Sequence, residues 1–583
     1  MNKLFVTILA LLSLLTISCG KEYLDRTPQT NISDGEFWRT SNDMKLYANN
    51  WYNFFPNYNG WGSIGIYGLD ADQGSDNMIT MTYNTFLNGE RVVPASGGGW
   101  DWGDVRNVNY FLANYTKSTD DWNSIKTYVG EALFFRAWVY FDLLKNFGDL
   151  PWINKPLVPG DPELFAERVS RSIIADSMLN DLDRAIEYLP SKSMAEMSRV
   201  NKQIAQLLQA RIALFEGSWE KYHANTPFGV SGADGSKFFQ KAATVSSALI
   251  ATPDGYGLEQ FTTPTGYWEL FNRLSYASSS EIMLWRQYNL NLNGGHRWYR
   301  YTTSGAGRGL TKDLIDAYLC TDGLPISTSL LYQGDNSLLD LVKNRDPRLV
   351  QTIYVNDAEH VITNNAPGGI ADIVFEVPSF VNSAEARPAT GYQVYKGHNP
   401  DYTQQQDQGT SGLILFRFAE ALLINAEAKA ELGTLTQADA DLTINKLRQR
   451  VQMPSLLVAA ISPDPSAEFP ALSSLINEIR RERRVELACE GYRLDDLMRW
   501  AAMDEKIAGW KPLGAKRAQW DGLVPADDLD NYPVNGAGYI ELFQTIPAVS
   551  TGYKFRTDRD YLLPLPDNQR LLNPNLTQNP GWQ

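Results

Sequence analysis

Two glutamates in the last third of the chain have the residue type and spacing that acid–base chemistry requires. Glu486 and Glu490 are four residues apart, which places both carboxylates on one face of a helix. Paired carboxylates cleave glycosidic bonds in many hydrolases. The same face carries Arg483 and the apolar Ile479 and Leu487, and charges on such a face favour a buried ion-pair network. We therefore predict a structural role for the pair and no catalytic residue, with a glycoside hydrolase as the less favoured alternative.

Metal-binding patterns are weak. None of the four histidines lies in an HExxH run or beside a cysteine pair, so a zinc site is not expected. Asp70, Asp72 and Asp76 lie close together in a glycine-rich block and could hold a structural calcium ion, although their spacing is not that of an EF-hand. No other cofactor is expected.

Two aromatic clusters in irregular segments have the chemistry that binds sugars. A hexose offers an apolar C–H face, which a flat ring covers, and a rim of hydroxyls, which polar side chains bind. The first cluster consists of Trp61, Tyr67 and Trp100, with Asn88 and Arg91. The second consists of Arg297, Trp298, Tyr299 and Tyr301. We predict ligand binding at these residues; the alternative is that the rings pack beneath the loops.

Cys19 closes a short apolar stretch that starts at Leu4, behind the positive charge of Lys3. A positive start, about a dozen apolar residues and a small residue before the cut are the marks of a secretory signal. A cysteine directly after the cut predicts a bacterial lipoprotein, with residues 1–18 removed and Cys19 lipidated. The stretch is shorter than the ~20 residues that a membrane-spanning helix requires.

The overall charge limits the partners. The 583 residues include 52 Lys and Arg against 67 Asp and Glu, which gives a net charge of −15. A chain this acidic is a poor candidate for binding nucleic acid. Aromatic residues make up 12% of the chain, and many of them fall in the Gly- and Asn-rich stretches that contain the two clusters.

Helical periodicity accounts for the segments that must position these residues. The predicted helices cover 129–147, 172–188, 201–217, 237–250, 414–432, 437–450 and 472–500, the last bent at Gly491. Small residues where 414–432 meets 437–450 resemble a tetratricopeptide pair. The large irregular blocks 57–103 and 252–412 interrupt the helices. The expected fold is mainly α, a tetratricopeptide-like scaffold with large irregular insertions in a single domain over residues 19–583.

Several motifs, in order along the chain, resemble the SusD/RagB family of nutrient-uptake lipoproteins. They are Tyr23–Pro28, Glu131–Pro151, Asn344–Arg348, Phe416–Leu423, Glu478–Leu487 with Glu490–Arg493, and Tyr561–Trp582. The resemblance implies an N-terminal part at about 20–220 and a C-terminal part at about 280–583. It also implies a tetratricopeptide-like fold and lipid anchoring at the outer membrane of a Bacteroidetes-type bacterium, facing the exterior.

The resemblance further implies a partner and a role. Members of this family pair with a SusC-like TonB-dependent transporter, capture an oligosaccharide or polysaccharide, and deliver it to the transporter without acting as enzymes. Some members capture peptides instead, and this alternative stays open here. Binding residues vary among members, so the two aromatic clusters are predicted from position and chemistry alone.

Overall fold

The computed structural model describes most of the chain after residue 36. The described residues are 37–58, 71–292, 294–297, 302, 305–356, 380, 387–399, 401–404 and 409–582. Of the predicted site residues, Cys19, Trp61, Tyr67, Asp70, Trp298, Tyr299 and Tyr301 lie outside these ranges. Within the described ranges, no helix is both long enough and apolar enough to cross a membrane.

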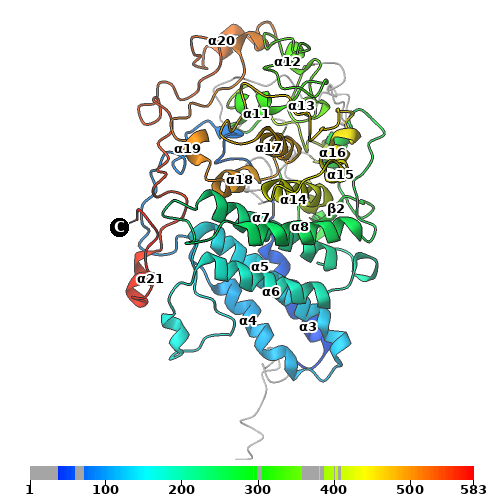
Figure 1. The fold of residues 1–583 in the computed structure, drawn as a ribbon, viewed down its shortest axis with the longest axis vertical. Helices are drawn as coiled ribbons and strands as arrows, with labels where there is room; N and C mark the ends of the chain where they lie inside the picture. Colours follow the sequence, from blue (N-terminus) through cyan, green and yellow to red (C-terminus); the bar gives the residue numbers. More distant parts are fainter. Residues whose placement is uncertain are drawn as a thin grey trace, which may run out of the picture.

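A layered array of helices forms one half of the molecule (Figure 1). Its helices are α3 (Ser41–Asn49), α4 (Gly103–Asn114), α5 (Trp122–Phe147), α6 (Arg171–Tyr188), α7 (Lys202–Tyr222) and α8 (Ser236–Ala251). From α5 onward each helix packs on the next one in sequence, and α14 (Phe418–Glu431) continues the series by packing on α8 and α7. This arrangement confirms the predicted helical-repeat scaffold.

The helix α5 shows how the sequence sets these elements. Asp121 caps its N-terminus by accepting a hydrogen bond from the Asn123 N–H, and Gly148 ends it with φ +71°. A buried guanidinium group requires an ionic partner, and Arg136 on this helix is buried. It donates from Nε and Nη2 to the two carboxylate oxygens of Asp181 on α6, at 2.6 and 2.7 Å. The ion pair therefore fixes α5 against α6 in one register.

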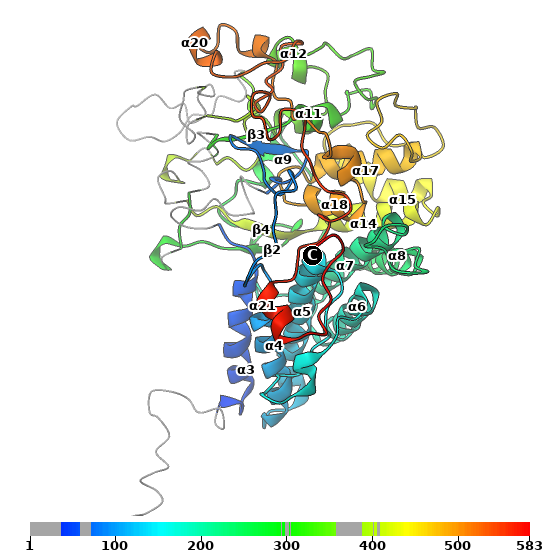
Figure 2. The ribbon, with the colours of Figure 1, turned by 90° about the vertical axis from the view of Figure 1, so that its left-hand side faces the viewer.

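The second half contains shorter elements around α17 (Ser474–Glu486). They include α15 (Gln437–Leu442), α16 (Ile444–Arg450), α18 (Arg493–Arg499), α9 (Gly266–Leu270), α11 (Lys312–Ala317), α12 (Leu338–Val342), α13 (Pro347–Val350), α19 (Met503–Lys506) and α20 (Ala526–Leu529). The last helix, α21 (Asp567–Leu572), belongs to the first half (Figure 1). Two antiparallel pairs of strands are described: β1 (Met78–Thr80) with β3 (Arg308–Leu310), and β2 (Ile282–Arg286) with β4 (Leu413–Arg417). The C-terminal segment returns to the first half, where the Leu563 N–H donates to the Asn146 carbonyl at 2.7 Å and α21 follows (Figure 2).

Three predicted helices differ from the structure. Residues 414–417, predicted to begin a helix, belong to strand β4 instead, because Leu413–Arg417 pairs with β2. The predicted helix 437–450 breaks at Thr443, whose ψ is −95°. The predicted helix 472–500 ends at Glu486 and resumes at Arg493, because Cys489 (φ +64°) and Gly491 (φ +84°) adopt positive φ between the two parts.

The contact between α7 and α8 depends on Gly235. Its φ is +76°, and a Cβ there would lie well inside van der Waals distance of the Gly217 carbonyl oxygen on α7. We expect Gly235→Ala to destabilise the protein by about 1–3 kcal/mol more than Gly232→Ala. Gly232 has a similar φ of +73° but no neighbouring atom within 4 Å, so it controls for backbone strain alone. Urea unfolding of both variants tests this; equal losses would contradict the steric explanation.

Candidate functional site

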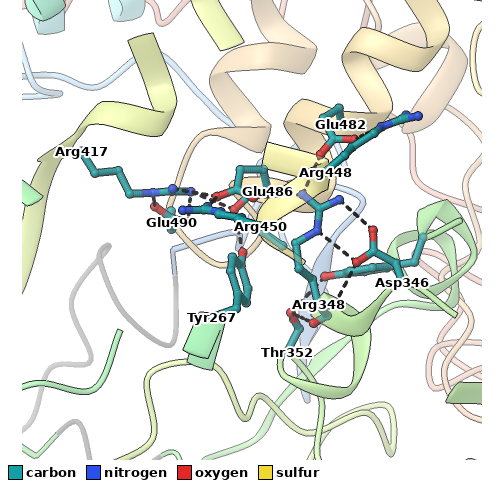
Figure 3. Close-up of polar contacts among 12 residues, drawn as sticks. Tyr267, Asp346, Arg348, Thr352, Arg417, Arg448, Arg450, Glu482, Glu486 and Glu490 are labelled. Carbon is teal, nitrogen blue, oxygen red and sulfur yellow. Dashed lines mark hydrogen bonds and ion pairs between the residues drawn. The ribbon is translucent and has the colours of Figure 1, made fainter. Parts of the chain in front are cut away.

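The carboxylate of Glu486 lies among three arginines from three different segments (Figure 3). Arg348 and Arg417 donate to it at 2.9 and 2.8 Å, and Arg450 forms a further short contact. All four side chains are almost completely buried. We call this group the Glu486 cluster. Burial alone would raise the pKa of Glu486, but the charges of Arg450, Arg417 and Arg348 outweigh it and lower the pKa to about 2.

Glu490 belongs to the same arrangement. It accepts hydrogen bonds from Arg417 at 2.6 and 2.8 Å and from the buried Lys396 at 2.7 Å. Glu281, from the start of β2, accepts from Arg417 and Arg450 at 3.1 and 2.7 Å. This confirms the predicted ion-pair network. Glu486, whose pKa is about 2, is a poor proton donor at neutral pH, and the Glu490 carboxylate is held by Arg417 and Lys396, so the pair does not fit the acid–base role of a glycosidase.

Further ion pairs connect the Glu486 cluster to neighbouring helices. Arg348 on α13 also donates to Asp346 at 2.7 Å and to Glu482 on α17 at 2.6 Å. Arg448 on α16 donates to Glu482 at 2.8 Å. The network thereby joins β2, β4, α13, α16 and α17. It holds these elements in fixed positions relative to one another, and the irregular segments extend from them.

Asp72 and Asp76, the two described residues of the three proposed as calcium ligands, bind protein groups instead. Asp76 forms ion pairs with Arg493 at 2.7 Å and Arg484 at 3.2 Å. Asp72 accepts the backbone N–H groups of Cys489 and Gly491 at 2.8 and 3.1 Å. Among the residues that the structure describes, no group of three or more potential ligands could hold a metal ion. This geometry does not support a calcium site at Asp72 and Asp76.

The described members of the first aromatic cluster have structural contacts. Trp100 is only 7% exposed and packs edge-to-face on Phe147 and Trp102, with ring centroids 4.9 and 5.3 Å apart. Asn88 accepts the Lys554 N–H at 3.2 Å, and Arg91 pairs with Asp560 at 3.4 Å. The expectation that Trp100 offers a sugar-stacking face does not fit this burial, since the side chain belongs to the core.

Three aromatic rings from distant parts of the chain contact one another. The rings of Tyr58, Tyr288 and His296 lie 4.6–5.7 Å apart, and the Tyr58 N–H donates to the Tyr288 hydroxyl at 2.7 Å. We call these residues the aromatic junction. Tyr58 directly precedes residues 59–70, and His296 is followed by Arg297, which is 8% exposed, and then by 298–301. Sequence reasoning missed the junction, because no local pattern links positions 58 and 296.

A cleft of about 550 Å³ lies between the junction and the Glu486 cluster. Tyr58 and Trp138 line it on one side, and Lys396 and Glu490 belong to its lining on the cluster side. Lys145 on α5 reaches Asp495 in α18 at 3.1 Å, and both residues also line the cleft. Its volume falls in the range of small-ligand sites.

Comparison with known proteins identifies the class. The SusD family model matches residues 271–582, and a second model, described as starch-binding and associating with the outer membrane, matches residues 102–214. The first match covers more than half of the chain. The protein therefore belongs to the SusD family.

Relatives share its length and fold. A SusD-like protein of Formosa agariphila is 24% identical over 537 residues, which cover 88% of this chain and 95% of that protein. The crystal structure of a SusD-like protein from Bacteroides fragilis has a TM-score of 0.68 and 25% identity, covering 96% of this chain and 100% of the other. A laminarin-binding SusD-like protein has a TM-score of 0.55 and 20% identity, covering 94% of this chain and 100% of the other.

Removing the charge of Glu486 should strongly destabilise the fold. Glu486→Gln leaves three buried arginines short of one negative charge, and breaking a buried pair typically costs about 3–5 kcal/mol. Glu163→Gln is the matched control, because Glu163 pairs with the half-exposed Lys155 at 2.8 Å and should change stability by less than about 1 kcal/mol. Urea unfolding at pH 7 measures both. A loss in Glu486→Gln as small as the control's would refute a structural role for this charge.

Mild acid should destabilise the protein through His296. Burial lowers the pKa of His296 to about 4, below its unfolded value of about 6.5. The unfolded state therefore binds more protons between these values, so stability present above pH 6.5 is lost as the pH falls toward 4, by up to about 1.4 kcal/mol per pH unit. Unfolding free energies of wild type and His296→Gln at pH 7.5, 6 and 5 test this. The variant should show a smaller slope; identical slopes would show that His296 does not contribute.

Proposed function

We propose that this protein is a lipid-anchored outer-membrane protein, facing the cell exterior, that captures oligosaccharide or polysaccharide and delivers it to a SusC-like TonB-dependent transporter. The observation that supports this most directly is the aromatic junction. It brings Tyr58, which directly precedes the segment 59–70, against Tyr288 and His296, and His296 lies two residues before the segment 298–301 in sequence. Each segment contributes aromatic residues of the kind that stack on sugar rings.

The composition of the two segments favours glycans over other ligands. Trp61 and Tyr67 in the first and Trp298, Tyr299 and Tyr301 in the second offer broad, stiff rings that give up little conformational entropy on binding. The laminarin-binding relative shares this fold, which adds support for a carbohydrate ligand.

Lipidation at Cys19 supports the delivery step. A lipid tether confines the capture protein to the bilayer that holds its transporter, and this raises the effective concentration of the two partners. Attachment through more than one acyl chain makes the anchoring firm. We infer the identity of the partner from family membership. The non-enzymatic role agrees with the Glu486 cluster, in which the carboxylate is paired with three arginines.

Substitutions of two tryptophans separate ligand binding from packing. Trp298→Ala should weaken retention in polysaccharide-loaded native gels by about tenfold or more, as for other interface aromatic residues, without shifting the unfolding midpoint. Trp100→Ala should instead lower stability by about 3–5 kcal/mol, because its ring is buried.

The same gels decide between the candidate functions. Retention by at least one polysaccharide without release of reducing ends would support glycan capture. Binding to peptides alone would replace the glycan proposal with the peptide alternative, and steady release of reducing ends by the wild type would contradict the non-enzymatic role. Unchanged retention of Trp298→Ala by a bound glycan would exclude this ring from the site.

A further inference from the structure

Four large apolar side chains are exposed at one end of the helical array. Leu46 is 55% exposed, Trp122 42%, Met194 79% and Met197 70%. We call these four residues the apolar end. Exposed apolar residues scattered singly are ordinary, but a group of them at one place marks an interaction surface.

Contacts among neighbouring residues show that the four belong to one end. The Trp122 ring, at the start of α5, packs edge-to-face on Tyr188 at the end of α6, with centroids 5.1 Å apart. The connection from α6 to α7 leaves from there and carries both methionines. It then reaches α3, where Glu196 pairs with Lys45 at 2.8 Å, beside Leu46. The connection therefore runs from Tyr188, the ring partner of Trp122, past Asp254 and Gly255, which accept hydrogen bonds from Ser193 and Lys192, to Lys45, the residue before Leu46.

The N-terminal segment enters the fold at this same end. The Thr119 N–H donates to the Arg39 carbonyl at 3.0 Å, and the Ser41 N–H donates to Asp120 at 2.7 Å. Figure 1 places α3 and α4 at the end opposite α12 and α20. Only residues 20–36 separate Cys19 from Phe37, and 17 residues span at most about 60 Å. A lipid on Cys19 would hold this end of the molecule nearest to the bilayer.

The charges around the apolar end do not oppose contact with lipid. Asp43 accepts a hydrogen bond in the capping box of α3, Asp120 accepts from Ser41, and Asp121 caps α5. Glu196, which lies between the two methionines in sequence, pairs with Lys45 at 2.8 Å, and Asp254 accepts the Ser193 N–H at 2.8 Å. Tryptophan is favoured at the membrane–water interface. Burying a methionine or leucine side chain is worth about 1.5–3 kcal/mol, which is little for free association but effective for a surface that a tether already holds close.

We propose that the apolar end rests on the lipid surface of the membrane that anchors the chain. The proposal rests on the proposed lipidation of Cys19, since the tether selects this end. Contact here would give the anchored protein a defined orientation, with the helical array toward the membrane and the α12 and α20 end away from it.

The test replaces the native lipid by a chemical tether, so that it does not depend on Cys19. Residues 20–583 with an N-terminal hexahistidine tag are captured on phosphatidylcholine vesicles that contain a nickel-chelating lipid. A nitrobenzoxadiazole maleimide is attached to Met194→Cys. Cys320 is buried and burial raises the pKa of the Cys489 thiol, so the unsubstituted chain should take up little label. We expect the fluorescence to rise about twofold or more on capture, as the probe leaves water, and to reverse with imidazole.

Leu571→Cys on α21 is the matched control, because Leu571 is 84% exposed and α21 follows the segment that binds Asn146, near the opposite end of α5. Its fluorescence should stay nearly constant on capture. Adding Trp122→Ser and Met197→Ser should reduce the rise at position 194. Equal responses at 194 and 571, or no response at either, would overturn the proposal. Loss of membrane association in Cys19→Ala cells tests lipidation separately, so failure of one proposal is distinguishable from failure of the other.

Discussion

The burial of one carboxylate, Glu486, against three arginines is the interaction on which the second half of the structure depends. Removing these charges from water costs several kcal/mol for each ion, and the cost is recovered only when every partner is in place. The partners come from β4, α13 and α16, and Glu281 at the start of β2 completes their pairing. Each segment is therefore held in position by the others, which explains how short elements joined by long irregular connections form a defined frame.

This constraint also explains the interruption between α17 and α18. In a continuous helix, the backbone N–H groups of residues 487–492 would donate to carbonyl groups of the helix itself. The positive φ of Cys489 and Gly491 turns their N–H groups toward the buried Asp72 instead. Asp76 of the same segment pairs with Arg484 and Arg493 on either side of the break. Asp72 and Asp76 of the glycine-rich block thus supply carboxylates that bind the two ends of the interrupted helix.

Local sequence patterns predicted those helices whose formation depends mainly on nearby residues. The helices α5, α6, α7 and α8 follow from apolar periodicity and capping residues. The strand β4 could not be predicted in this way, because residues 413–417 have no local preference strong enough to oppose pairing with β2, 130 residues earlier. The break after Glu486 likewise depends on a distant partner, the buried Asp72.

The residue types around the candidate site could be interpreted from the sequence, but the long-range contacts that bring them together could not be predicted. The charged pair of Glu486 and Glu490 was correctly assigned to a network, because their helical face is partly apolar. Trp100 and Trp298 look equivalent in sequence, since both follow glycine-containing irregular stretches. Only long-range contacts with Phe147 reveal that the ring of Trp100 belongs to the core. In a chain with this many aromatic residues, the tryptophans that serve the scaffold differ from those available to a ligand by what surrounds them. The aromatic junction at Tyr58, Tyr288 and His296 shows the same dependence, because it is made by residues that no local pattern connects.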